Sequence, residues 1–219
     1  MIKRDNPFPA VCGRVCPHTC EAECTRNCLD DPLAIDDIKK FIADLDLQAE
    51  ERFLPEIHEK YQERVAVIGG GPAGLACAYH LAVNGYPVTV FEKNTRLGGM
   101  LSNEMPPFRL DRAVIEAEIN VIRHLGVKFR TGVEIGAELS LEALRNQGFK
   151  AFYLAIGAQA GRRLNIEGED AVGVQTGVDF LREAGRGGMR LKGNTLVIGG
   201  GNVAIDVARS AVRACDGEV

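Results

Sequence analysis

Apolar residues occur in short runs that alternate with helical patterns along most of this chain. Residues 65–68 form a continuous apolar run, residues 72–84 suit a helix, and residues 88–91 form a second apolar run that ends before Glu92. Short apolar runs bounded by glycine are typical of strands, and a helix between two of them is typical of a parallel βαβ unit. The pattern therefore predicts an α/β fold built on a buried parallel sheet.

Further elements of the same kinds are expected beyond this unit. Residues 111–125 have the spacing of an amphipathic helix whose buried face carries Val114, Ile115, Ile119, Ile122 and Leu125. Other predicted elements are a strand over 127–129, a helix over 140–145 with Ser140 as its N-cap, a strand over 152–156 and a strand over 195–198. The run 152–156 ends at Gly157 and is uninterrupted, which predicts a strand buried on both faces.

The first 64 residues follow a different pattern. Residues 1–30 show almost no periodic apolar spacing, which predicts a loop held by something other than its own core. A helix is expected after Pro32, because apolar residues recur at helical spacing along one face. These residues are Ile35, Ile38, Phe41, Ile42 and Leu45. The charged stretch 48–64, interrupted by Pro55, predicts a connector.

Charge and composition exclude several classes of function. The 219 residues include 26 Lys and Arg against 30 Asp and Glu, a formal net charge of −4, which argues against nucleic acid as a partner. Residues 65–91 carry no charge, but five glycines and two prolines argue against a membrane span. The first ten residues have no apolar region of the signal-peptide kind, so we expect a reduced, cytoplasmic location.

The glycine turn after the first predicted strand carries the clearest chemical signal. Gly69, Gly71 and Gly74 have the G-x-G-x-x-G spacing between a strand and a helix, and Glu92 follows 18 residues after Gly74. The glycines allow a tight turn, close approach of a pyrophosphate and close helix packing, while the acidic residue is placed to bind a ribose hydroxyl. The combination predicts a dinucleotide site, against the simpler interpretation of a structural glycine turn.

A second turn of this kind lies near the end of the sequence. Gly199, Gly201 and Ala204 give G-x-G-x-x-A after the predicted strand 195–198, with a helix expected from Asn202. Asp206 lies inside that helix and is not expected to bind a ribose. Nearby, Arg209 and Arg213 are one helical turn apart and are expected to be solvated surface residues rather than phosphate ligands.

Five of the seven cysteines lie within 17 residues, and the run CGRVCPHTCEAEC contains four of them at a constant spacing of four. These four are Cys12, Cys16, Cys20 and Cys24. Thiolates brought together on a compact loop suit zinc or an iron–sulfur cluster, and the C-x-x-C pairs usual in zinc fingers are missing here. An iron–sulfur cluster is therefore favoured over zinc and over free buried cysteines. His18, inside the same loop, is expected to be a loop or surface residue.

Several motifs after the first turn resemble the two-dinucleotide-binding-domain flavoproteins. They are the glycine pair in KNTRLGGML and the segment YLAIGA at 153–158. The resemblance implies that the first unit binds FAD and the second NADPH or NADH. The FAD-binding residues are then expected to be Gly69, Gly71, Pro72, Ala73, Gly74, Glu92, Lys93, Gly98, Gly99, Met100, Ala155 and Gly157. Those of the second unit are Gly199, Gly201, Asn202 and Ala204.

The runs NPFPAVCGRVCPHTCEAECTR, DDPLAIDDIKKF, MPPFRL and LNIEGED resemble the small (beta) subunit of NADPH-dependent glutamate synthase and its relatives, including the amino-terminal half of dihydropyrimidine dehydrogenase. The resemblance covers essentially the whole chain. It implies a small helical, α-helical ferredoxin-like segment with [4Fe–4S] clusters ahead of a Rossmann-type FAD domain. It also implies Cys16, Cys20 and Cys24 as cluster ligands, with Cys12 part of the same motif, whereas Cys28 has no counterpart.

This resemblance also predicts how the chain is divided and what it does. The expected parts are an iron–sulfur segment (1–50), a connector (51–64), an incomplete FAD domain (65–190) and the start of an NAD(P) domain (191–219). A position near Lys39, where relatives use a Gln or Glu ligand, carries lysine here. The chain is expected to be a fragment or split subunit of an oxidoreductase that passes electrons from NAD(P)H through FAD to iron–sulfur clusters and a larger redox or amidotransferase subunit. The alternative is a non-catalytic electron-relay or docking piece of a larger redox complex.

Overall fold

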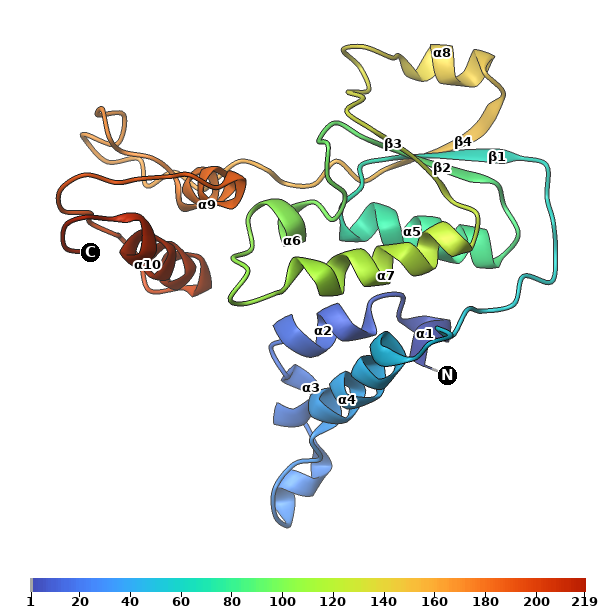
Figure 1. Ribbon diagram of the computed structural model, residues 1–219, viewed down its shortest axis with the longest axis horizontal. Coiled ribbons are helices and arrows are strands. Elements are labelled where there is room, and N and C mark those ends of the chain that lie inside the picture. Colours follow the sequence, from blue (N-terminus) through green and yellow to red (C-terminus); the bar gives the residue numbers. More distant parts are fainter. Residues whose placement is uncertain (1) are drawn as a thin grey trace.

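The computed structural model describes residues 2–219 and divides visibly into a body, a helical arm and a side lobe (Figure 1). The body contains the sheet and its covering helices, the arm contains α1 to α4, and the lobe contains α9 and α10.

The helices of the arm are α1 Ile2–Asp5, α2 Pro9–Val15, α3 Thr19–Ala22, the 3-10 helix η1 Thr25–Cys28 and α4 Ile35–Gln48. The other helices are α5 Pro72–Val83, α6 Met100–Asn103, α7 Arg112–His124, α8 Leu141–Asn146, α9 Gly177–Arg186 and α10 Asn202–Ala214. The strands are β1 Arg64–Ile68, β2 Val88–Glu92, β3 Lys128–Thr131 and β4 Phe149–Leu154.

The four strands form one parallel sheet in the order β3-β2-β1-β4. In the register, Val65 lies opposite Val88 on one side and Ala151 on the other. The predicted βαβ unit of β1, α5 and β2 is confirmed, and β2 is buried along its whole length. Parallel strands need a crossover connection, which α5 and α7 provide.

Helices cover the sheet on both sides, with α5 and α7 on one face and α8 on the other (Figure 1). The predicted face of α7 is confirmed, because Ile115, Ile119 and Ile122 are buried against α5 and the sheet. The short helix α8 is also confirmed, and the Ser140 hydroxyl accepts a hydrogen bond from the Ala143 amide at 3.0 Å as its N-cap.

The prediction that residues 152–156 form a strand buried on both faces is wrong. Strand β4 begins three residues earlier and ends at Leu154, whose side chain is 62% exposed. The reason is that β4 is the edge of the sheet and pairs only with β1 among the described strands. Tyr153 of β4, and Ile156 just after the strand, are therefore exposed.

The strand expected over 195–198 is also absent from the described chain. These residues pair with no strand, and Leu196 is 87% exposed. A strand exists through its ladder of hydrogen bonds, and an apolar run alone does not provide the partner. The helix that follows, α10, is present as expected and packs on α9 through Phe180, Leu181 and Val207.

The prediction of a loop over residues 1–30 is corrected by the presence of α1, α2, α3 and η1. These helices are too short for apolar periodicity to show, and they gain burial from tertiary packing: Phe8 and Val11 join the core beneath α5 and α7. The helix expected after Pro32 is confirmed as α4. It packs on α2 through Ala43, while the apolar face that contains Phe41 is exposed.

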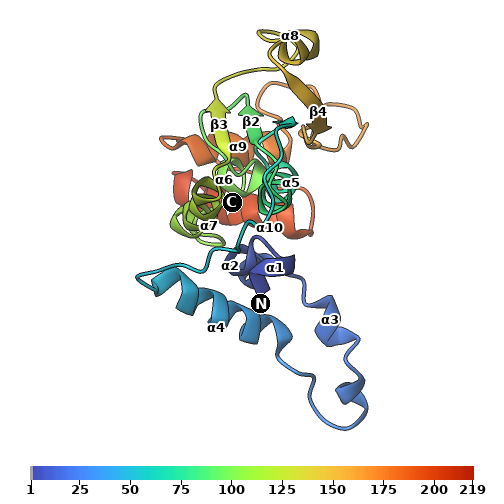
Figure 2. The same cartoon turned by 90° about the vertical axis from the view of Figure 1, so that its right-hand side faces the viewer.

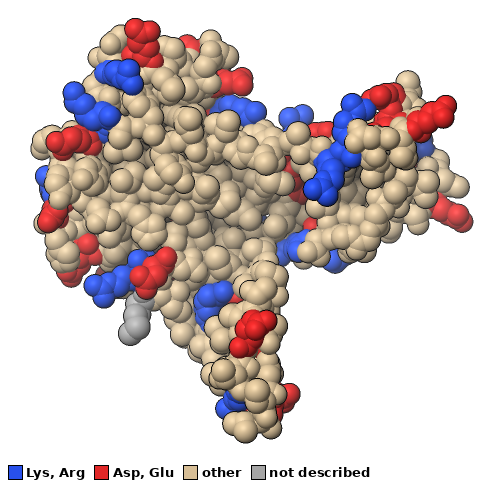
Figure 3. Space-filling model, turned by 180° about the vertical axis from the view of Figure 1, so that it is seen from behind, with Lys and Arg blue, Asp and Glu red and all other residues tan. Residues whose placement is uncertain are grey.

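Figure 2 shows the arm from the side, projecting away from the sheet beneath α7. On the face seen in Figure 3, acidic and basic side chains are interspersed over the body and the lobe. Across residues 2–219, each helix falls short of the length and apolar character needed to cross a membrane. Residues 49–63, where a connector is expected, have no regular secondary structure.

Candidate functional site

The first glycine turn connects β1 to α5, and two of its glycines have no room for a side chain. Gly69 has φ +110°, and a Cβ there would lie 2.2 Å from the Ala155 carbonyl oxygen of the segment after β4. A Cβ at Gly74 would lie 1.9 Å from the Gly69 carbonyl oxygen. These approaches are far inside contact distance, so the turn can close only with glycine at both positions.

A buried carboxylate ties this turn to the end of β2. Glu92 Oε2 accepts a hydrogen bond from the Gly70 amide at 2.7 Å, and Oε1 accepts from the Asn94 amide at 2.8 Å and its side chain at 2.7 Å. The Gly98 amide in turn donates to the Gly70 carbonyl at 2.7 Å. The predicted Glu92 and Gly98 therefore meet at Gly70, which the spacing rule had left out because it is an unspecified position of the motif.

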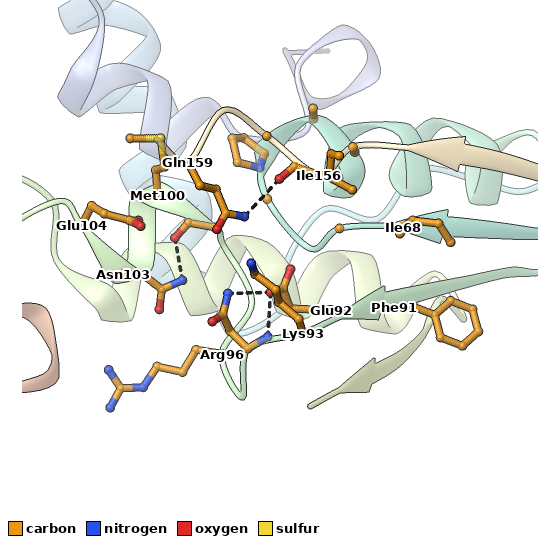
Figure 4. A pocket seen from close by; sticks show the side chains of 18 of the residues that line it. Ile68, Phe91, Glu92, Lys93, Arg96, Met100, Asn103, Glu104, Ile156 and Gln159 are labelled. Carbon is orange, nitrogen blue, oxygen red and sulfur yellow. Dashed lines mark hydrogen bonds between the residues drawn. The ribbon is translucent and has the colours of Figure 1, made fainter. Parts of the chain in front are cut away.

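A cavity of about 1120 Å³ opens beside this turn at the carboxyl ends of the strands (Figure 4). Ten of the predicted residues line it: Gly69, Gly71, Pro72, Ala73, Glu92, Lys93, Gly99, Met100, Ala155 and Gly157. Gly74 and Gly98 lie behind the wall and shape it. This edge of an open parallel sheet is where α/β proteins bind their ligands.

The turn is suited to a pyrophosphate. Gly71 is the N-cap of α5, has extended backbone and makes no side-chain cap, so the first amides of this helix keep no capping partner. A Cβ at Gly71 would meet only the Gly99 Cα, at 3.7 Å, so the space above the helix is open. Free amides and the helix dipole favour an anionic group there, and the size of the cavity leaves room for the rest of a dinucleotide.

Several residues of the cavity wall were not predicted. Arg182 of α9 donates from Nε to Glu104 Oε1 at 3.0 Å and from Nη2 to the Gln159 carbonyl at 3.1 Å. Figure 4 shows Glu104, Gln159 and Asn103 grouped at the end of the cavity opposite Glu92. This contact joins residues 78 positions apart, and no local sequence pattern indicates it.

The second glycine turn contributes nothing to this cavity. Gly201 is the N-cap of α10, and neither Gly201 nor Gly200 has an atom within 4 Å of a would-be Cβ. Gly199, Asn202 and Ala204 also lie away from the wall. The helix of this turn faces the body instead.

Three charged residues of α10 contact the body or its loops. Asp206 is buried and accepts from Arg109 Nη1 at 2.6 Å. The guanidinium groups of Arg209 and Arg213 lie over the Phe108 ring, 4.0 and 4.5 Å from its centroid. Both arginines are exposed, as expected of surface residues, and they also pack on an aromatic ring.

The cysteines occupy successive short elements of the arm. Cys12 and Cys16 lie one turn apart in and after α2, Cys20 is in α3, and Cys24 caps η1. All are free thiols, and no three His, Cys, Asp or Glu residues of the described chain converge as a metal site. The backbone amides of Leu33 and Arg26 donate to Cys24 and lower the pKa of its thiol, which favours the thiolate form that binds soft metals.

Ion pairs connect the cysteine region to the start of α4. His18 contacts Glu21 at 3.0 Å and the buried Asp36 at 3.3 Å, and its hydrogen bond to Glu21 raises the pKa of the imidazole. Lys39, at the position where relatives are expected to use an oxygen ligand, is paired with Asp36. His18 is thus a structural residue of the loop, and Lys39 fixes the start of α4.

The fold and the glycine turn define a dinucleotide-binding α/β protein with an appended cysteine-rich arm. Residues 63–219 match the family of pyridine nucleotide-disulphide oxidoreductases, and the chain belongs to that family. Residues 1–51 match the 4Fe-4S cluster domain described as dihydropyrimidine dehydrogenase domain II. FAD, NAD(P)H and a [4Fe–4S] cluster are the cofactors of these two families of domains.

Curated relatives combine both parts in longer proteins. The chain is 43% identical to the NADPH-Fe(3+) oxidoreductase subunit beta of Geobacter sulfurreducens over 97% of its own length and 32% of that protein. It is 38% identical to the NAD-dependent dihydropyrimidine dehydrogenase subunit PreT of Salmonella typhimurium, over 94% of this chain and 50% of that protein. The chain therefore spans about a third of the first relative and half of the second.

Among solved structures, the chain resembles Mycobacterium tuberculosis FprA in complex with NADPH, with a TM-score of 0.59 and 26% identity. The match covers 68% of this chain and 36% of FprA. It also resembles 2-naphthoyl-CoA reductase, with a TM-score of 0.56 and 25% identity over 74% of this chain and 23% of that protein. These matches agree with the predicted fold class of a Rossmann-type flavoprotein.

Proposed function

We propose that this chain is the flavin and iron–sulfur part of an NAD(P)H-dependent oxidoreductase that passes electrons to a partner subunit. The observation that carries the proposal is the cavity beside the first glycine turn, with a buried acid at one end and the open N-terminus of α5 in the middle. Relatives of this chain are named as subunits of NADPH- and NAD-dependent oxidoreductases, which supports the coarse function.

The shape of the cavity suggests how FAD would be held. The α5 amides beside Gly71 would bind the pyrophosphate, and Glu92 would face the adenosine ribose, since a carboxylate oxygen can accept more than one hydrogen bond. The flavin end would then lie toward Met100 and Asn103. When bound, FAD supplies the chemistry that accepts two electrons together and releases them one at a time. The chain's own residues position it and exclude water.

We propose the cysteines of the arm as the cluster ligands, because thiolates are the usual ligands of iron–sulfur clusters. Cys16, Cys20 and Cys24, with Cys12 from the same motif, would hold the iron–sulfur centre on the arm. NAD(P)H would bind at the second glycine turn. No acid–base pair with a nucleophile is needed from the chain, because the cofactors carry the redox chemistry.

The finer assignment is the glutamate synthase small-subunit type, with a larger redox or amidotransferase subunit as partner and the cytoplasm as location. The sequence resemblance supports it, whereas the relatives described above are other iron–sulfur flavoprotein oxidoreductases. The division of the chain into iron–sulfur segment, connector, FAD domain and NAD(P) domain belongs to the same proposal.

The absorption spectrum of anaerobically purified chain, followed by NADPH-dependent reduction of a dye, tests this function. We expect flavin bands and a broad iron–sulfur band, and dye reduction when the complete oxidoreductase is assembled. A specific observation favours the alternative of a relay or docking piece for the chain alone: no residue of its second glycine turn lines the cavity beside the first turn. Cofactor bands without dye reduction in the assembled protein would establish that alternative.

A further inference from the structure

The arm meets the body on the side of α7 that is opposite the sheet (Figure 1). Charged side chains of the arm, the connector and the body come together there. Lys3 of α1 is buried and donates from Nζ to Asp46 Oδ2 of α4 at 2.5 Å. Arg52 of the connector donates from Nε to the same oxygen at 2.7 Å. The other oxygen of Asp46 accepts from the Phe53 amide at 2.9 Å. One carboxylate therefore gathers three segments of the chain.

The same cluster reaches the helices of the body. Arg52 Nη1 donates to the Ala117 carbonyl of α7 at 3.2 Å, and its Nη2 lies 3.6 Å from Glu118 Oε1. The Tyr79 hydroxyl of α5 donates to the carbonyl oxygen of Lys3. These contacts link α1, α4 and the connector to α5 and α7, and none of these residues lines the cavity.

Glu118 is the least compensated member of the cluster, because its ion pair with Arg52 is long, at 3.6 Å. It is 0% exposed, and neither of its carboxylate oxygens has a hydrogen-bond partner among residues 2–219. An ionised carboxylate without hydrogen bonds is costly to bury. Asp46 differs, because burial raises the pKa of its carboxyl group but hydrogen bonds from Lys3, Phe53 and Arg52 outweigh this and lower it.

Burial raises the pKa of Glu118 to about 7. Lys3 and Arg52 act in the opposite direction, and Asp46 adds to the rise. The backbone amide of Ala10 on α2 also lowers the pKa of Glu118. The phenol of Tyr79 lies nearby, and burial and Glu118 raise the pKa of that phenol to about 12. Glu118 is thus the group of this cluster that changes charge near neutral pH.

We propose that Lys3, Asp46, Arg52 and Glu118 form a charged joint that seats the arm on the body, and that ionisation of Glu118 loosens it. If the arm lifts away, Glu118 meets water and titrates near its ordinary pKa of 4.5. The pKa is higher in the seated state, so seating is strongest below about 4.5 and weakens as the pH rises through about 7. With these two pKa values, the equilibrium constant for seating the arm on the body falls roughly tenfold between pH 6 and pH 8.

The joint is independent of the cofactor assignment. It also has a consequence for the proposed function, because the arm carries the cysteines and the body carries the cavity. Seating of the arm fixes the separation between the two. A looser joint would allow that separation to vary.

Amide hydrogen exchange of the full chain, purified with its cofactors and measured at pH 6 and pH 8, tests the joint. After correction for the intrinsic exchange rate, we expect the amides of α1 and α4 to open roughly tenfold more often at pH 8, while β1 and β2 stay unchanged. Glu118→Gln should remove this pH dependence. Glu116→Gln is the matched control, because Glu116 lies on the same helix but is exposed and paired with Arg123.

Three outcomes would overturn the proposal. The first is that opening of the α1 and α4 amides in the natural chain changes less than about twofold between pH 6 and pH 8. The others are that this pH dependence survives in Glu118→Gln, or that it is lost in Glu116→Gln. Should Glu118→Gln fail to fold, Arg52→Gln provides a second test. It removes a cation that lowers the pKa of Glu118, so the midpoint of the transition must move to higher pH. An unchanged midpoint in that variant would contradict the joint.

Discussion

The first glycine turn follows a strand that pairs on both sides, whereas the second follows a segment that pairs with no strand of the described chain. Both turns begin a helix, and both carry the same spacing of small residues. Around the first, Glu92 and Ala155 arrive from neighbouring strands and complete a cavity. The spacing thus provides a helix start, and the neighbouring strands decide whether a binding site surrounds it.

The largest expected difference between the turns is in stability. A valine at Gly74 would collide with the Gly69 carbonyl oxygen, so Gly74→Val should lower the free energy of unfolding by more than about 3 kcal/mol. At the second turn, Gly200 has open space, and Gly200→Val should cost less than about 1 kcal/mol. Urea denaturation of both variants measures this, and equal losses would remove the distinction between the turns.

The cysteines allow a second comparison, because a cysteine of the arm is expected to bind the iron–sulfur cluster and a cysteine of the lobe is not. Cys16→Ser should abolish bound iron and acid-labile sulfide, since thiolates are the ligands of such clusters. Cys215→Ser, at the end of α10, should leave both intact, because that thiol contacts only groups of the lobe, among them the Gly193 carbonyl at 3.0 Å and the Gly217 amide at 3.3 Å. Iron and sulfide analysis is the measurement. One zinc ion and no sulfide in the natural chain would refute the assignment.

The smallest expected signal is NADPH binding at the second turn. Contacts to the ribose and nicotinamide come from strands beyond the first turn of a dinucleotide fold, and residues 195–198 pair with none here. Each lost 1.4 kcal/mol weakens binding tenfold, so calorimetry of the chain should detect no binding below about 1 mM NADPH. Micromolar affinity would show that the second turn forms a complete site as it stands.

The sequence predicted the centre of the sheet better than its edges. The βαβ unit of β1, α5 and β2 has strong local signals, and so has the N-cap of α8. The edge position of β4 and the missing strand before Gly199 depend on partners that an apolar run does not specify. The short helices of the arm were missed because tertiary packing stabilises them rather than their own periodicity.

In the candidate site, too, residues fixed by a local motif were predicted and contacts between distant segments were not. Ten of the predicted cofactor residues line the cavity, because the motif constrains the backbone locally. The Glu104–Arg182 pair and the role of Gly70 were missed, since they depend on segments far apart in the chain. The convergence of the cysteines and the residue-level cofactor contacts remain predictions.

FAD content tests the central claim most directly, measured by absorption in the natural chain and in the matched variants Gly71→Val and Gly201→Val. Gly71 has extended backbone and open space around its Cβ position, so valine should leave the fold intact but occupy the place of the pyrophosphate. We predict about one FAD per chain in the natural protein and in Gly201→Val, and almost none in Gly71→Val. A folded Gly71→Val variant with the flavin content of the natural chain would contradict the account.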